Sequence, residues 1–132
     1  YTTGIIDQDF GKDWWCWNMD ICIDFDRAKY PEIIDKLRQT VRNHIPKSQL
    51  EYCESRWNDD EKEVLLSSVE WKPRTLRVVQ NFLDEINEVL KPIKSACQCD
   101  TFDSIWYQTN APFAVARICW TEEGLTIKGT SL

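Results

Sequence analysis

The sequence predicts an α+β fold in which two helices cover one face of an antiparallel sheet. Three features predict it: one stretch in which apolar side chains alternate strictly, two stretches with helical periodicity that end at prolines, and several short runs of strand-forming residues. The length of 132 residues favours a single domain over 1–132, with a lead-in segment over 1–13 and a tail over 129–132.

The alternating stretch covers residues 14–25, Trp-Trp-Cys-Trp-Asn-Met-Asp-Ile-Cys-Ile-Asp-Phe. Successive side chains of a strand point to opposite faces of a sheet, so this alternation buries one face and leaves the other partly in water. The apolar face consists of the odd positions Trp15, Trp17, Met19, Ile21, Ile23 and Phe25. We therefore expect a central strand here, with the helices packed on its odd face.

Two stretches repeat apolar residues at helical spacing. The first begins at Pro31, whose fixed φ suits a first helical turn, and ends at Pro46; Asp26 is expected to cap the turn before it. The second begins at Pro73 and ends at Pro92, with a wider apolar stripe. Two amphipathic helices of about four and about five turns are therefore predicted.

Between the helices, residues 50–57 and 64–71 are rich in strand-forming residues and flank a polar turn. A hairpin is the simplest interpretation. The alternative is a helix that begins at Asn58 and runs to Val69, with acidic residues in its first turn.

After the second helix we expect a short loop containing Cys97-Gln-Cys99, then strands over 105–109 and 113–120, and a short last strand over 125–127. The element order is then strand, helix, strand, strand, helix, strand, strand. This order predicts a ferredoxin-like antiparallel sheet with two helices on one face, plus an extra C-terminal hairpin strand.

The chain has a net charge of −6, and its acidic residues are unevenly distributed. Residues 1–26 hold six acids and one base, residues 27–50 hold two acids and six bases, and residues 51–63 hold six acids and two bases. Such a chain is repelled by nucleic acid and by anionic membranes, and it attracts basic partners. We therefore expect a basic protein partner, no nucleic acid and no membrane.

An acidic patch with aromatic anchors is the predicted binding site, because aromatic side chains hold complexes together and charges steer their formation. The alternative is that the acidic turn is only a solvated loop. The predicted partner-binding residues are Trp57, Asp59, Asp60, Glu61 and Glu63 around the hairpin turn, with Trp14, Asp20 and Asp24 on the helix-free face of the sheet.

Signals for catalysis and for cofactor binding are weak. Asp24 and Asp26 end a strand, as some catalytic carboxylates do, but the second group of ligands such a site needs is not recognisable. His44 is better explained as a positive charge at a helix end than as a catalytic base. Zinc at Cys97-Gln-Cys99 lacks further ligands at finger-type spacing. We expect no enzyme activity, no metal and no cofactor.

Six cysteines leave the compartment open to two interpretations. Cys16, Cys22 and Cys119 have apolar neighbours, which is typical of buried free thiols, and six in 132 residues is sparse for a disulfide scaffold. No apolar run approaches the roughly 18 residues of a membrane span. We expect reduced thiols and a cytoplasmic location; a secreted, disulfide-linked domain is the alternative.

In size, acidity, tryptophan content and α+β pattern, the chain resembles the immunity proteins that neutralise toxins delivered between competing bacteria. The resemblance covers the whole chain and rests on overall character, without a shared motif. It implies a non-catalytic bacterial protein that inhibits a basic toxin, such as a nuclease, by stoichiometric binding. The alternative is a small-ligand or carbohydrate-binding module that stacks its ligand on exposed tryptophans.

Overall fold

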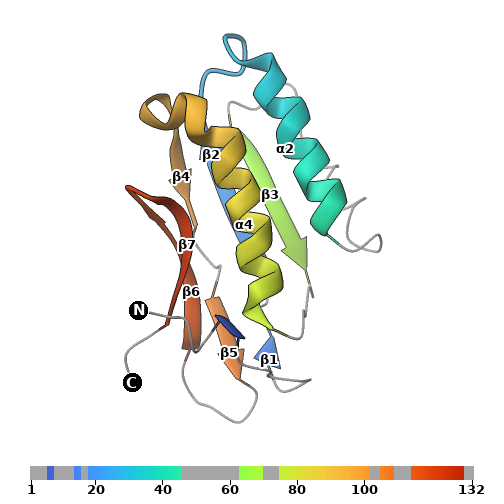
Figure 1. The fold of residues 1–132 in the computed structure, drawn as a ribbon, viewed down its shortest axis with the longest axis vertical. Coiled ribbons are helices and arrows are strands. Elements are labelled where there is room, and N and C mark those ends of the chain that lie inside the picture. Colours follow the sequence, from blue (N-terminus) through green and yellow to red (C-terminus); the bar gives the residue numbers. More distant parts are fainter. Residues whose placement is uncertain are drawn as a thin grey trace.

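A computed structural model describes residues 6–7, 14–15, 18–45, 63–69, 75–101, 105–108 and 114–129 (Figure 1). Over these ranges the chain forms helices and antiparallel strands, which confirms the α+β class. The helices are α2 (Pro31–His44), α4 (Leu76–Leu90) and the 3₁₀ helix η1 (Lys91–Ala96); the strands are β1 (Trp14–Trp15), β2 (Asn18–Asp24), β3 (Glu63–Val69), β4 (Gln98–Asp100), β5 (Ile105–Gln108), β6 (Ala114–Thr121) and β7 (Gly124–Gly129).

The strands form two ladders, β3-β2-β4 and β1-β5-β6-β7, and every described pairing is antiparallel. The stretch predicted as one central strand over 14–25 is described as two strands, β1 and β2, which belong to different sheets. Trp14 of β1 pairs with Gln108 of β5, whereas Asp24 of β2 pairs with Gln98 of β4. The two helices and the antiparallel strands are compatible with the ferredoxin-like arrangement. The strand predicted over 50–57 lies outside the described residues.

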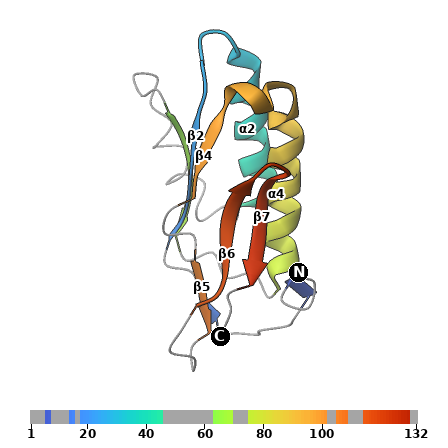
Figure 2. The same cartoon turned by 90° about the vertical axis from the view of Figure 1, so that its left-hand side faces the viewer.

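Both long helices lie on the same side of the sheet, and β6 and β7 curve toward α4 (Figure 2). The parity predicted for the central strand is confirmed over its described part. Ile21 and Ile23 are fully buried and Phe25 is 5% exposed, whereas Asp20 and Cys22 are half-buried and Asp24 is exposed. The odd face of β2 thus lies under the helices, where apolar burial stabilises the fold.

Helix α2 begins at Pro31 as predicted, because a proline at the first helical position loses no hydrogen bond. Asp26 caps the preceding turn rather than the helix: its Oδ1 accepts a hydrogen bond of 3.1 Å from the Lys29 amide, and the N-cap position belongs to Tyr30. Ile33, Leu37 and Val41 recur every four residues and form the buried stripe of α2.

Helix α4 buries a wider stripe than α2, as predicted. Six of its residues are buried at spacings of one to four: Leu76, Val79, Phe82, Leu83, Ile86 and Leu90. The α-helix ends at Leu90, just before Pro92, as predicted, and the chain continues as the 3₁₀ helix η1. The segment before Thr75, including Pro73, lies outside the described residues.

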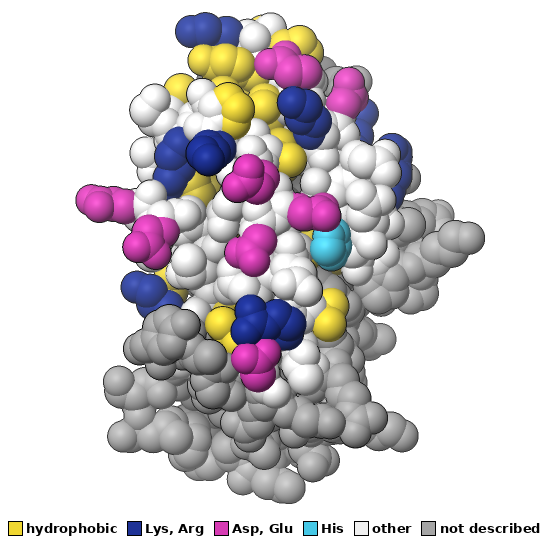
Figure 3. Space-filling model, viewed as in Figure 1, with side chains coloured by type: hydrophobic (Ala, Val, Ile, Leu, Met, Phe, Trp, Pro, Cys, Tyr) yellow, Lys and Arg dark blue, Asp and Glu magenta, His cyan; other side chains and the backbone are white. Residues whose placement is uncertain are grey.

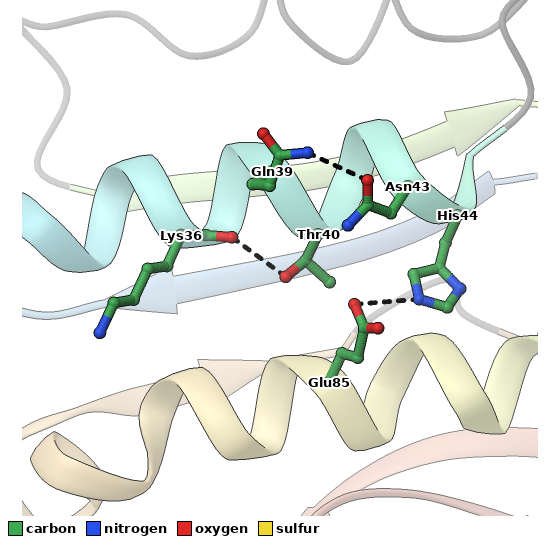
Figure 4. A network of polar contacts seen from close by, with 6 residues as sticks. All are labelled: Lys36, Gln39, Thr40, Asn43, His44 and Glu85. Atoms are coloured by element: carbon green, nitrogen blue, oxygen red, sulfur yellow. Dashed lines mark hydrogen bonds and ion pairs between the residues drawn. The ribbon is translucent and has the colours of Figure 1, made fainter.

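A polar contact between described residues joins the two helices. His44 Nε2 at the end of α2 lies 3.0 Å from Glu85 Oε2 of α4, and the two side chains point toward each other (Figure 4). The His44 ring also packs on Phe82, with 5.7 Å between the ring centroids. His44 therefore belongs to the helix interface, and its predicted place at a helix end is confirmed.

Several predictions need correction. The loop expected around Cys97 and Cys99 contains strand β4, which pairs with β2 and was missed because three residues are too few to show a periodicity. The alternative helix from Asn58 to Val69 is wrong, since Glu63–Val69 form a strand that pairs with β2 along its whole length. The expected tail begins later than predicted, because β7 extends to Gly129.

The cysteines also differ from expectation. Cys22 and Cys119 are only half-buried, whereas Cys97, which the sequence placed in a loop, is a core residue. All four described cysteines are free thiols. None of the described helices combines the length and the apolar character that crossing a membrane requires.

Candidate interaction surface

The helix-free side of the sheet carries the described part of the predicted site. Asp24 of β2 and Asp100 of β4 are exposed, and Asp20 is half-buried. Glu63 is the direct register partner of Asp24, and Asp100 is the partner of Cys22. Opposed residues of an antiparallel pair have Cα atoms about 4.5–5.5 Å apart. The register thus brings acidic residues of three strands to one end of the sheet.

The structure does not bring Trp14 to this acidic end. Trp14 lies ten positions before Asp24 in the chain, and it pairs with Gln108 of β5. Trp57, Asp59, Asp60 and Glu61 lie outside the described residues, so the acidic hairpin turn stays a prediction.

A second acidic surface, which the sequence did not predict, covers the outer face of α4. It consists of Asp84, Glu85 and Glu88 of α4 with Glu122 and Glu123 of the turn between β6 and β7, all of them exposed. Figure 3 shows acidic side chains gathered over the middle of the helix side, beside the single histidine. We call these five residues the acidic surface.

The acidic surface borders a groove of about 300 Å³ between the end of α4 and the β6–β7 turn. Trp120 of β6 lies in it half-buried, with Glu88, Glu122 and Glu123 among its lining residues. Lys94 of η1 reaches into the same groove: its Nζ lies 3.3 Å from the centroid of the Trp120 ring and donates a hydrogen bond of 2.8 Å to the carbonyl of Thr121. We call this the Trp120 groove.

Helix α4 positions the groove because its side chains bind the edge of β7. Asn87 donates a hydrogen bond of 2.9 Å to the Leu125 carbonyl and accepts one of 2.7 Å from the Leu125 amide. About two turns earlier in α4, Gln80 accepts a hydrogen bond of 3.2 Å from the Ile127 amide. These side-chain amides take the place of a neighbouring strand, which leaves less of the edge open to other chains.

This contact requires glycine at the start of β7. Gly124 has a φ of +110°, and a Cβ at this position would lie 2.5 Å from Asn87 Oδ1. Glycine adopts positive φ without steric cost and leaves room for the Asn87 amide. The β6–β7 turn, and with it Glu122 and Glu123, is therefore held against α4.

Two of the described cysteines, Cys97 and Cys99, lie in surroundings that disfavour the thiolate. Burial raises the pKa of the Cys99 thiol to about 12, with a further contribution from the neighbouring Cys97. Burial also raises the pKa of Cys97, and the positive charge of Lys94 offsets part of this increase. Because the thiolate is the reactive form, a raised pKa makes both thiols weaker nucleophiles. Among the described residues, no three His, Cys, Asp or Glu side chains are arranged to hold a metal ion.

Comparison with known proteins yields no relative: no family model, curated protein or solved structure matches the chain.

The sequence does contain a signal for the second surface. Trp120 is followed within four residues by Glu122, Glu123 and Gly124. This is the same combination of an aromatic residue and a carboxylate turn that favoured Trp57 and its neighbours. The contribution of α4 had no such signal, because only the pairing with β7 places Glu88 next to that turn.

Proposed function

We propose that this protein is a non-catalytic binding protein that recognises a basic protein partner through the acidic surface. The observation that carries the proposal is the collection of five exposed carboxylates from α4 and the β6–β7 turn beside a groove that contains a tryptophan. Complementary charge steers association, and a partly buried aromatic side chain offers an anchor for the complex.

The more specific form of the proposal is an inhibitor of the immunity-protein type, which neutralises a basic toxin such as a nuclease by stoichiometric binding. The net charge of −6 supports it, since nuclease domains present basic surfaces that bind nucleic acid phosphates. The raised pKa values of Cys97 and Cys99 argue against thiol catalysis by these two residues.

A carbohydrate-binding role receives no support at Trp120. The ammonium group of Lys94 lies over the ring of this tryptophan, where a sugar would stack.

The test is a comparison of three immobilised charge variants with the immobilised wild type. One variant removes the three carboxylates of the acidic surface that line the groove, one removes two carboxylates on the sheet side, and one removes three in the predicted hairpin turn. Their substitutions are, in that order, Glu88→Gln with Glu122→Gln and Glu123→Gln, Asp24→Asn with Asp100→Asn, and Asp59→Ser with Asp60→Ser and Glu61→Ser. Proteins of the host are passed over each variant, and the retained ones are identified by mass spectrometry.

We expect a basic protein to bind the wild type and the sheet-side variant, and to bind the acidic-surface variant at least tenfold more weakly. Its association rate with the wild type should fall as salt rises, because exposed charges are screened. For a toxin partner, its activity should be abolished at a 1:1 ratio. Equal binding to the wild type and the acidic-surface variant would contradict the proposal, and loss of binding in the turn variant alone would move the site to residues 59–61.

A further inference from the structure

The Trp120 groove already contains a cation, supplied by the chain itself. Lys94 Nζ lies 3.3 Å from the centroid of the indole ring and donates a 2.8 Å hydrogen bond to the carbonyl of Thr121. The face of an aromatic ring attracts cations, and tryptophan does so most strongly. The ring of Trp120 and the carbonyl of Thr121 together are therefore a binding site for an ammonium or guanidinium group.

The negative charges around this site are not used by Lys94. Glu88, Glu122 and Glu123 line the groove with exposed side chains, and none of them forms a salt bridge with any residue in the described ranges. The contacts of Lys94 in these ranges are with a neutral ring and a neutral carbonyl. Three carboxylates thus remain available to a second cation that enters the groove.

We infer that the Trp120 groove binds an arginine side chain of the basic partner, and that Lys94 is a placeholder which leaves the ring when the partner binds. The inference rests on the proposed function and names the group that the acidic surface recognises. A guanidinium group stacks flat on an indole ring while its N–H groups bind carboxylates in pairs, so it satisfies the ring and the glutamates together. Lysine, a compact charge on a flexible stem, is the residue that is more readily displaced.

The competing role for Lys94 is that of an anchor, which ties η1 to β6. The two roles predict opposite effects for Lys94→Met, a change that keeps the aliphatic stem and removes the ammonium group. A placeholder competes with the partner, so its loss strengthens binding. An anchor holds the groove in shape, so its loss weakens binding.

Lys91 supplies the matched control, because it lines the same groove, is exposed and carries the same charge, but makes no cation–π contact with the Trp120 ring among the described residues. The probe is a fluorescein-labelled nona-arginine peptide, followed by fluorescence polarisation at low salt. We expect Lys94→Met to bind it about threefold to tenfold more tightly than the wild type, and Lys91→Met to gain less than about twofold.

A third variant tests the ring. Adding Trp120→Leu to Lys94→Met should remove the gain, provided that thermal melting shows a folded protein. Equal gains in affinity for Lys94→Met and Lys91→Met would mean that only long-range charge matters, and would overturn the inference. Weaker peptide binding by Lys94→Met, or no binding by any variant, would overturn it as well. In each of these cases the proposed function is still tested separately, by the capture experiment with the acidic-surface variant.

Discussion

Helices α2 and α4 cover the same face of the sheet, but their charges follow different rules. The N-terminus of a helix carries partial positive charge and its C-terminus partial negative charge. In α2 an acid, Glu32, lies in the first turn, and Arg42 and His44 lie in the last. In α4 the first turn has no acid and the last has no base; Arg77 lies near the start and Glu88 near the end.

Charges at helix ends typically contribute about 0.3–1 kcal/mol each. Glu32 and Arg42 stabilise α2, whereas Arg77 and Glu88 oppose the dipole of α4. At the start of α4 the charge of Arg77 is compensated by Asp7, whose carboxylate accepts two hydrogen bonds of 2.9 Å. The charge pattern of α4 is thus not the one that stabilises an isolated helix.

The polar side chains of the two helices differ in the same way. In α2, Gln39 binds Asn43 and Thr40 binds the Lys36 carbonyl, so these contacts remain inside the helix (Figure 4). In α4, Gln80 and Asn87 bind the backbone of β7. Both helices cover the core, and α4 in addition binds a sheet edge and carries carboxylates of the acidic surface.

The largest effect is expected in the core, where the two helices should contribute equally to the free energy of unfolding. Leu37 of α2 and Leu83 of α4 are both fully buried. Replacing either with alanine should lower the free energy of unfolding by about 3 kcal/mol, because the change removes apolar contact and leaves a cavity. Urea denaturation of the two variants measures this. A loss below about 1 kcal/mol in one of them would mean that the helices already differ in the core.

An intermediate effect is expected at the sheet edge. Asn87→Leu keeps the approximate volume of the side chain but leaves the amide and carbonyl of the fully buried Leu125 without their partner. We expect a loss of about 2 kcal/mol, together with self-association at high concentration through the uncovered edge of β7. Urea denaturation and sedimentation velocity measure the two effects.

Asn43→Leu is the matched control on α2, since Asn43 is exposed and its described bond is to Gln39 of the same helix. This variant should stay within about 0.5 kcal/mol of the wild type and remain monodisperse to the same degree. Similar losses in both variants would remove the distinction between a covering helix and a connecting one.

The smallest effect concerns the start of α4. The hydrogen bonds from Arg77 hold the pKa of Asp7 below its usual value of 3.8. A lowered pKa in the folded protein means that the contact stabilises above the unfolded pKa and that this stabilisation is lost as the pH falls through the folded pKa. Asp7→Asn should therefore be slightly less stable than the wild type at neutral pH.

The difference should shrink as the pH is lowered below about 4 and should also shrink with added salt, because the pair is exposed. Thermal melting at several pH values measures it. Asp35→Asn on α2 removes one exposed carboxylate elsewhere and controls for net charge. A difference between Asp7→Asn and the wild type that persists unchanged at about pH 2 would show that the pair does not act through its charge.

The local pattern of residues was sufficient to predict the helices and strands that are long and periodic. The alternation of Ile21, Ile23 and Phe25 identified the buried face of β2, and the spacing of apolar residues identified both helices to within a few residues. Such predictions succeed because a strand and a helix present their side chains with fixed periods, and burial selects the apolar ones at those periods. The same reasoning missed β4, whose three residues cannot express a period.

The acidic surface, in contrast, depends on tertiary structure. Glu88 and Glu122 are 34 positions apart, and they border one groove because Asn87 binds the backbone of β7. Likewise, Lys94 meets Trp120 only because η1 passes beside β6. Periodicity reports which face of an element is buried, but it carries no information on which side chains from distant elements meet. The alternation and the charge of the chain follow from its residues alone, whereas the position of the Trp120 groove follows from the contact of α4 with the edge of β7.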